Sequence, residues 1–215
     1  MVTHTADRLF TEEQKKKIVQ AAREAEARTT GEIVVIVANT SGTYYDLKAA
    51  SAMGLSAVMS LLVCVSVFHV SLWNLLILTA VFFPLAFLYF SRAQAVTLDL
   101  APTRRIEGAV RNAALREFYE HGIYKTKGHT GVLFYISLLE RRVFVLADKG
   151  IYEKIPQQVL DRYASEVATG IKAGRACEAL IKAIAEIGEL LAAHFPGLPD
   201  DSNELPDSVL SDTDQ

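Results

Sequence analysis

The feature that most constrains the fold is a run of 43 residues, between Lys48 and Arg92, that contains no Asp, Glu, Lys or Arg. A single helix needs about 20 apolar residues to cross a bilayer, so this run accommodates two crossings. Its most polar stretch lies near the middle. We therefore predict one transmembrane helix over about residues 50–70 and a second over about residues 72–90. The tight turn between them carries Trp73, an aromatic side chain suited to the headgroup layer.

The competing interpretation is that this run forms core helices of a soluble protein. It is less favoured, because soluble helices of this length are seldom apolar on every face. A secretory signal sequence is not expected, since the first apolar run begins near residue 50. Lys48 and Arg92 flank the pair, whereas the turn has no Lys or Arg, so both soluble segments are expected in the cytoplasm. This predicts a protein of the cell inner membrane with two spans and cytoplasmic termini.

Composition limits the partners and cofactors. The net charge of −3 offers no basic footprint for nucleic acid, so no nucleic-acid partner is expected. Cys64 and Cys177 have no His or second Cys at metal-binding spacing, so no zinc site is predicted. A cytoplasmic location also argues against a disulfide between them. The lipid bilayer is the first partner that the sequence indicates.

The polar parts of the chain predict a small α/β domain. Thr11 and Gln14 form a capping box that begins a helix, and a continuously apolar strand follows at Glu32–Ala38. Two further apolar strands, at residues 131–138 and 142–148, are separated by three residues and predict an antiparallel hairpin. Further helices are predicted near residues 103–121, 156–169 and 174–195. The predicted fold is a small mixed sheet with helices on both faces (α/β/α), interrupted by the two-helix transmembrane hairpin.

Four segments follow from this organisation. Residues 1–48 hold the first helix and strand of the domain, and residues 49–91 hold the transmembrane hairpin. Residues 92–197 complete the domain. Residues 198–215 contain acidic residues and no basic one, and we expect this tail to be disordered.

The candidate site lies where the second predicted strand begins and the third ends. Common nucleotide-binding, serine-hydrolase and zinc-protease motifs are absent from the chain. Thr126, His129 and Thr130 precede one strand, and Asp148 and Lys149 close the other, so these side chains should meet at one sheet edge. His129 and Asp148 would form a polar pair there. The plainer alternative, which we favour, is that Asp148 caps the following turn and His129 is an exposed loop residue.

Two other patterns have plain interpretations. Glu140, Arg141 and Arg142 lie at the opposite end of the predicted hairpin and are interpreted as a solvated turn. Small residues recur every fourth position in the first membrane helix: Ala52, Ser56, Ser60 and Cys64. Such a stripe allows close packing, either against the second helix, which we favour, or in a dimer.

Several motifs together resemble the TPM domain family, and in particular its membrane-inserted bacterial branch. They are Thr30-Gly31-Glu32-Ile33-Val34-Val35, Thr130-Gly131-Val132-Leu133, Glu140-Arg141-Arg142-Val143 and Ala147-Asp148-Lys149-Gly150-Ile151. The resemblance implies an α/β/α domain. Relatives are reported as acid phosphatases, as calcium-binding proteins or as factors in membrane-complex assembly. They tend to carry an acidic residue before the Gly-Val-Leu strand, where this chain has His129-Thr130. That departure removes an oxygen ligand, so no cofactor is expected, and calcium is the less favoured alternative.

Three functions remain open at this point. The first is a membrane-anchored interaction module that binds a membrane protein and helps to assemble or maintain a complex. The second is a phosphatase acting on phosphoesters at the membrane surface, with Asp148 as nucleophile or acid and with His129, Thr130 and Lys149 holding the phosphate. The third and weakest is lipid or small-anion binding through arginines near the membrane: Arg92, Arg104, Arg105 and Arg111. Whether the chain is an enzyme is left undecided.

Overall fold

The computed structural model describes residues 9–67, 71–197 and 209–211. It divides into two units, a globular unit of residues 1–41 and 107–215 and an apolar unit of residues 42–106. The helices are α2 (Glu12–Glu26), α3 (Tyr45–Ser66), α4 (Leu72–Arg92), α5 (Gln94–Asp99), α6 (Thr103–Glu120), α7 (Lys149–Tyr152), α8 (Gln157–Lys172), α9 (Ala176–His194) and the 3₁₀ turn η1 (Ile123–Lys125). The strands are β1 (Glu32–Ala38), β2 (Gly131–Ser137), β3 (Arg142–Ala147) and β4 (Val209–Ser211).

The first helix begins as its sequence predicts. The side chain of Thr11 accepts a hydrogen bond from the backbone N–H of Gln14 (3.2 Å), and the Gln14 side chain accepts one from the N–H of Thr11 (2.9 Å). Two N–H groups that the helix leaves unpaired are thereby satisfied. The buried face of α2 then packs on α9, where the Cβ of Ala25 lies close to Gly188.

The sheet is mixed, as predicted, and within the described residues its strand order is β3-β2-β1-β4. β1 pairs with β2 in parallel over its whole length, from Glu32 opposite Gly131 to Ala38 opposite Ser137. β2 and β3 form the expected antiparallel hairpin. Every residue of β1 and β2 is buried, in keeping with their continuously apolar sequences.

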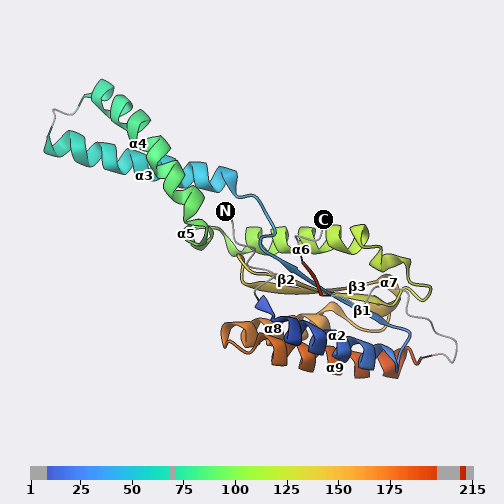
Figure 1. The fold of residues 1–215 in the computed structure, drawn as a ribbon. Coiled ribbons are helices and arrows are strands. Elements are labelled where there is room, and N and C mark those ends of the chain that lie inside the picture. Colours follow the sequence, from blue (N-terminus) through green and yellow to red (C-terminus); the bar gives the residue numbers. More distant parts are fainter. Residues whose placement is uncertain (1–8, 68–70, 198–208, 212–215) are drawn as a thin grey trace. The chain divides into compact units, whose positions relative to one another are not determined.

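Helices cover both faces of this sheet, which confirms the predicted α/β/α architecture (Figure 1). α2, α8 and α9 lie on one face, and their apolar side chains share a core with alternate strand residues such as Val35, Phe134 and Val145. α6 lies over the other face, where Leu133 and Tyr135 point and are fully buried. Successive side chains of each strand therefore point alternately towards the layer of α2, α8 and α9 and towards the layer of α6.

Several short elements differ from the prediction. Residues 209–211, inside the segment expected to be disordered, form β4 and pair in parallel with β1, from Val35 opposite Val209. Without β4, the edge of β1 would be open. β4 forms because its backbone pairs with the N–H and C=O groups that this edge would otherwise leave unpaired. Residues 198–208 and 212–215 of the predicted tail lie outside the described residues. α7 and η1 form where turns and a loop were predicted.

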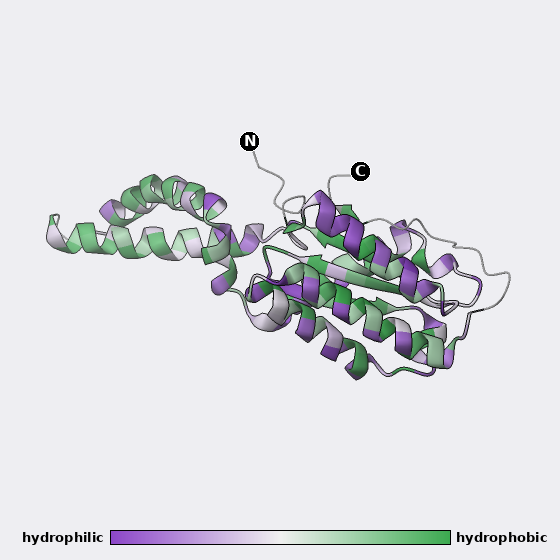
Figure 2. Ribbon diagram, turned by 60° about the horizontal axis from the view of Figure 1, so that its bottom comes forward, coloured by the Kyte–Doolittle hydropathy of each residue, from purple (hydrophilic) through white to green (hydrophobic). Residues whose placement is uncertain are grey.

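The apolar unit contains two long antiparallel neighbours, α3 and α4, which we call the apolar hairpin. Both are long and apolar enough to cross a membrane, by length and composition. In Figure 2 most of the ribbon of these two helices has the colour of hydrophobic residues, whereas hydrophobic and hydrophilic residues alternate along the helices of the globular unit. Large side chains such as Leu62 (57%) and Leu85 (62%) are exposed to a degree that core helices of a soluble protein do not show.

The small-residue stripe of α3 is buried against α4. Ala52, Ser56, Ser60 and Cys64 are each fully buried, and Thr79 of α4 donates a hydrogen bond to Ser60 at 3.1 Å. The favoured interpretation of this stripe is thus confirmed, because the face is already occupied. Trp73 was predicted in the turn but lies in the first turn of α4. Residues 68–70, the rest of that predicted turn, lie outside the described residues.

Candidate functional site

The predicted site residues converge at one sheet edge because of the hairpin register. Val132 at the start of β2 pairs with Ala147 at the end of β3, so the residue after β3 lies beside the loop before β2. The N–H of Asp148 donates to the carbonyl of Gly131 (2.9 Å), and the N–H of Gly150 donates to the carbonyl of His129 (3.1 Å). These bonds hold the loop before β2 against the start of α7.

Asp148 has two partners, one for each carboxylate oxygen. Its Oδ1 accepts a hydrogen bond from the backbone N–H of Lys149 at 2.7 Å and thereby caps α7. Its Oδ2 lies 3.1 Å from Nδ1 of His129. The Asp148 side chain is 11% exposed, whereas that of His129 is 62% exposed. The predicted polar pair and the predicted cap are therefore both present, and His129 is also the exposed loop residue of the plainer interpretation.

The two predicted ligand threonines lie at the same edge, but their hydroxyls serve the protein itself. Thr126 accepts a hydrogen bond from the backbone N–H of Thr130 at 3.0 Å. Thr130 donates its hydroxyl proton to the carbonyl of Thr30 at 2.6 Å, which ties the loop to the residue before β1. Both are buried. They hold the site in shape, and a direct contact between either hydroxyl and a ligand stays a prediction.

Asp148 and Lys149 open into a cleft of about 720 Å³ along the outer edge of β3. Phe144 and Leu146 of β3 form its apolar floor, while α6 and the α7–α8 segment form its walls. The polar and charged residues that line it are Arg111, Asp148, Lys149, Tyr152, Gln157 and Asp161. We call it the Asp148 cleft. A volume of this size suits a small molecule or a modified side chain.

Side chains of α7 and α8 satisfy the free edge of β3 within this cleft. The Tyr152 hydroxyl accepts from the N–H of Ala147 (3.2 Å) and donates to Oε1 of Gln157 (2.7 Å). The Gln157 amide donates in turn to the carbonyl of Val145 (3.2 Å) and to Oδ1 of Asp161 (2.7 Å). Burial raises the pKa of Tyr152, opposed by the Ala147 hydrogen bond and by the positive charge of Arg111. The phenol is thus held as a neutral donor.

The cleft is lined by two cations, Arg111 and Lys149, and by two carboxylates, Asp148 and Asp161. Within the described residues, the side chains of Arg111 and Lys149 make no ion pair, whereas Asp148 and Asp161 both accept hydrogen bonds. An unpaired guanidinium and an ammonium in one partly enclosed site favour an anionic group, and a phosphate or carboxylate matches the geometry of a guanidinium.

The site does not fit a calcium ion. Calcium takes six to eight oxygen ligands, whereas the carboxylates that line the cleft are two, those of Asp148 and Asp161. The residues described contain no cluster of three or more His, Cys, Asp or Glu side chains that could hold a metal. We therefore derive no metal-dependent step at this edge.

Of the residues that line the cleft, sequence reasoning placed only Asp148 and Lys149 at this site. Arg111 was grouped with arginines near the membrane, but in the structure it lines the cleft, while Arg105 pairs with Asp46 at 2.6 Å. Asp161, Tyr152 and Gln157 had no local signal, since they belong to ordinary amphipathic or turn sequences. Only the packing of α6 and α8 beside β3 brings them together.

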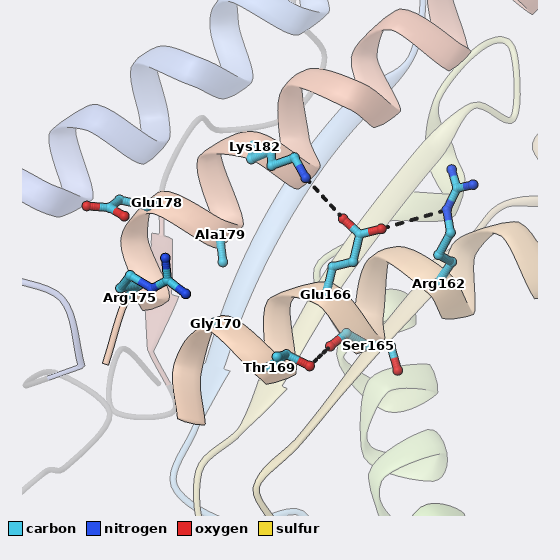
Figure 3. Close-up of a pocket in the computed structure, with 9 residues that line it drawn as sticks. All are labelled: Arg162, Ser165, Glu166, Thr169, Gly170, Arg175, Glu178, Ala179 and Lys182. Atoms are coloured by element: carbon cyan, nitrogen blue, oxygen red, sulfur yellow. Dashed lines mark hydrogen bonds and ion pairs between the residues drawn. The ribbon is translucent and has the colours of Figure 1, made fainter. Parts of the chain in front are cut away.

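A second depression lies between the outer faces of α8 and α9 and contains none of the predicted site residues (Figure 3). Glu166 bridges Arg162 (3.8 Å) and Lys182 (3.6 Å) across it. The two helices approach closely here, because a Cβ on Gly170 would lie 2.2 Å from that of Ala179. Its central charges neutralise one another, so we interpret it as a helix-packing groove with a solvated ion-pair network.

A protein-family model matches the part of the chain that contains the Asp148 cleft. The family model described as the TPM domain matches residues 92–190, a range that includes α6, β2, β3, the Asp148 cleft and most of α9. The resemblance to the TPM domain family is confirmed. The match begins where the apolar hairpin ends, so β1, which pairs with β2 in the same sheet, lies outside the matched range.

One solved structure shares the fold of this chain. It is the NMR structure of the BA42 protein from the psychrophilic bacterium Bizionia argentinensis, with a TM-score of 0.58 and 21% sequence identity. The alignment covers 94% of each chain. At this identity the similarity concerns the fold alone. No curated protein matches the chain.

Proposed function

We propose that this chain is a membrane-anchored TPM-domain protein whose Asp148 cleft binds an anionic group on a membrane-protein partner, in the assembly or maintenance of a membrane complex. The observation that carries this proposal is that Arg111 and Lys149 make no ion pair within the described residues, beside a carboxylate whose two oxygens each have a hydrogen-bonding partner. Two exposed cations that line one cleft can together hold an anionic group such as a phosphate or a carboxylate.

The anchoring part of the proposal rests on the apolar hairpin. Its exposed leucines, valines and aromatics require an apolar environment, and its two helices have the length of bilayer spans. The pairing of β1 with β2 supports an even number of crossings, because one strand precedes the hairpin and the other follows it. The positive charges of Lys48, Arg92 and Arg104 favour the cytoplasmic side of the inner membrane for both β1 and β2.

Hydrolysis of phosphoesters is the second candidate, and one observation favours it. The structure adds Asp161 to the cleft that contains Asp148, so two carboxylates line a site where the sequence indicated one. His129, at 3.1 Å from Asp148, would orient that carboxylate, and Arg111 would join Lys149 in holding the phosphate. Paired acids and positioned cations are the groups that such chemistry uses.

Full-length protein in phosphatidylcholine nanodiscs distinguishes the two candidates. Binding of phenyl phosphate should weaken at least tenfold in the double variant Arg111→Gln, Lys149→Gln, and chemical crosslinking to a membrane protein in cells should be lost in the same variant. Lys182→Gln, in the separate α8–α9 groove, is the matched control and should retain both. Equal binding by the double variant and the control would refute the cleft as a binding site.

The same samples are tested for hydrolysis of p-nitrophenyl phosphate. We expect no turnover above that of empty nanodiscs. Turnover by the wild type that disappears in Asp148→Asn would replace the binding proposal by the phosphatase.

A further inference from the structure

The far end of the β2–β3 hairpin contains a second cavity that the proposed function does not use. A cavity of about 330 Å³ opens there between the hairpin and the C-terminal turn of α8. Its lining residues are Ile136, Ser137, Leu138, Arg141, Arg142, Val143, Ala168, Ile171 and Lys172. We call it the hairpin-end cavity. It lies at the opposite end of β3 from Asp148, so the two sites are separate.

The charged side chains of this cavity all have the same sign. Arg141, Arg142 and Lys172 line it, and no acidic residue does. Within the described residues Arg141 and Lys172 make no ion pair, and Arg142 approaches Glu107 only at 3.9 Å with both side chains exposed. Such a distant, solvated contact neutralises little. The rim is therefore a site for an anion.

The neighbouring carboxylate of Glu140 does not pair with the cations of this cavity. Glu140 directly precedes Arg141, but its carboxylate is buried and accepts hydrogen bonds from the Ser137 hydroxyl, from the Thr40 hydroxyl (3.1 Å) and from the N–H of Ser41 (2.9 Å). These bonds hold the Glu140 carboxylate against the loop that follows β1. This buried acid also corrects the interpretation of Glu140 as part of a solvated turn.

The walls of the cavity are apolar. Leu138 and Val143 come from the hairpin, and Ala168 and Ile171 come from α8, and all four are only half-buried. Half-exposed aliphatic side chains that face one another favour an apolar guest. The volume is at the small end of the range for small-molecule sites, roughly 300–1,000 Å³, which limits the guest to one short chain.

The backbone conformation of Arg141 also supports a binding role for its side chain. Its φ is 52°, in the left-handed region, where it closes the hairpin turn through a bond from its N–H to the carbonyl of Leu138 (3.2 Å). Glycine is the usual residue at this position of a hairpin turn, because it has no Cβ to clash. An arginine here carries a backbone cost that its own side chain does not recover within the described residues.

We propose that the hairpin-end cavity binds a free single-chain amphiphile with an anionic headgroup. The short acyl chain lies between Val143 and Ile171, and the carboxylate or phosphate headgroup lies between Arg141, Arg142 and Lys172. The apolar walls supply the affinity for the chain, and the three cations select the sign of the headgroup.

The test uses full-length protein in phosphatidylcholine nanodiscs, with methyl NMR signals of Ile136 and Ile171 as local probes. Octanoate and octyl phosphate should each shift both signals to saturation. Octanol, which has the same chain without the charge, and inorganic phosphate, which has the charge without the chain, should each bind at least tenfold more weakly. Empty nanodiscs correct for partitioning into lipid.

Two variants make the result specific. The double variant Arg141→Gly, Lys172→Gln should bind octanoate at least tenfold more weakly while its other methyl signals stay in place, since both residues are exposed. Lys182→Gln, outside the cavity, should bind as the wild type does. Equal binding of octanol and octanoate, equal binding by the double variant, or an absence of shifts at Ile136 and Ile171 would each overturn the proposal.

Nanodiscs that contain phosphatidylglycerol distinguish a free amphiphile from the bilayer. They should leave the two methyl signals unchanged when no octanoate is added. The same shifts caused by phosphatidylglycerol alone would overturn the assignment to a free ligand and would make the occupant a membrane lipid.

Discussion

One carboxylate oxygen of Asp148 lies 3.1 Å from Nδ1 of His129, while the other caps α7 at 2.7 Å from the N–H of Lys149. The same acid thus fixes the loop before β2 and the helix after β3. Because α7 borders the Asp148 cleft, a change at this position acts on both the local fold and the shape of the cleft.

Substitutions at Asp148 should separate these two roles. Asp148→Ala removes the cap and the histidine contact, and we expect it to lower the stability of the globular unit by about 1–2 kcal/mol. Asp148→Ser keeps an oxygen that can cap α7, so its loss should be smaller. Calorimetric melting of the nanodisc samples measures both. Identical melting temperatures for Asp148→Ala and the wild type would contradict the capping role.

Two glycines should respond in opposite ways to the same substitution. A Cβ on Gly188 of α9 would lie 2.5 Å from the Cβ of Ala25 on α2, so Gly188→Ala should force the helices apart and cost about 1–3 kcal/mol. Gly108 of α6 has no atom within 4 Å of such a Cβ, so Gly108→Ala should stabilise its helix by up to about 1 kcal/mol. Urea unfolding of the globular unit gives the comparison, and losses of equal size would rule out the packing explanation.

Arg141→Gly alone should stabilise the fold. The residue occupies the left-handed region at φ 52°, which costs a non-glycine residue about 1 kcal/mol. We therefore expect a higher melting temperature together with weaker octanoate binding, a combination that a merely structural arginine would not produce. Lower stability of this variant would show that its side chain holds the turn in place.

Tyr152 should make stability fall at alkaline pH. Burial raises the pKa of its phenol above the ordinary value of about 10. The neutral form is therefore favoured in the folded state, and its contribution is fully present below pH 10. That contribution is lost as the pH rises from the unfolded-state pKa towards the raised value, because the unfolded chain then ionises first.

The comparison with Tyr152→Phe isolates this effect. The variant lacks the hydrogen bonds to Ala147 and Gln157, so at pH 7 it should be less stable by about 1 kcal/mol. The difference should shrink above pH 10, where only the wild type carries the titrating phenol. Urea titrations from pH 7 to 11 test it, and a constant difference would show that Tyr152 titrates alike in both states.

Topology provides the last prediction. An alkaline phosphatase that is active only outside the cytoplasm, fused after Gln215, should be inactive, whereas the same reporter inserted between the two helices of the apolar hairpin should be active. Lys48 and Arg92 are the flanking charges responsible. Activity of the C-terminal fusion would place the TPM domain on the opposite side. Recovery of the chain in the soluble fraction without detergent would refute the spans themselves.

The sequence predicts the elements whose side chains repeat with a clear period or run continuously apolar. The Thr11–Gln14 capping box, β1 and the β2–β3 hairpin are all found at or within a residue or two of their expected bounds. The convergence of His129 on Asp148 also follows from the sequence, because a two-strand register fixes it. Local pattern is sufficient wherever neighbours in space are near neighbours in the chain.

Prediction fails where distant elements meet or where an element is too short to show a period. α7 spans four residues and β4 three, so neither has a repeating pattern. Arg111 and Asp161 enter the Asp148 cleft from α6 and α8, and their position depends on how those helices pack beside β3. The role of Glu140 was missed for the same reason, since its partners Thr40 and Ser41 lie about a hundred positions earlier in the chain.

The insertion of the apolar hairpin between two adjacent parallel strands also sets the order of events during synthesis. β1 ends at Ala38 and β2 begins only at Gly131, an interval of roughly 90 residues, which a ribosome translates in about 5–20 s. Throughout that interval β1, all of whose side chains are finally enclosed, has no neighbour on its β2 side. The hydrophobic helices therefore leave the ribosome before the sheet can close, and the domain is completed only after both helices have been synthesised.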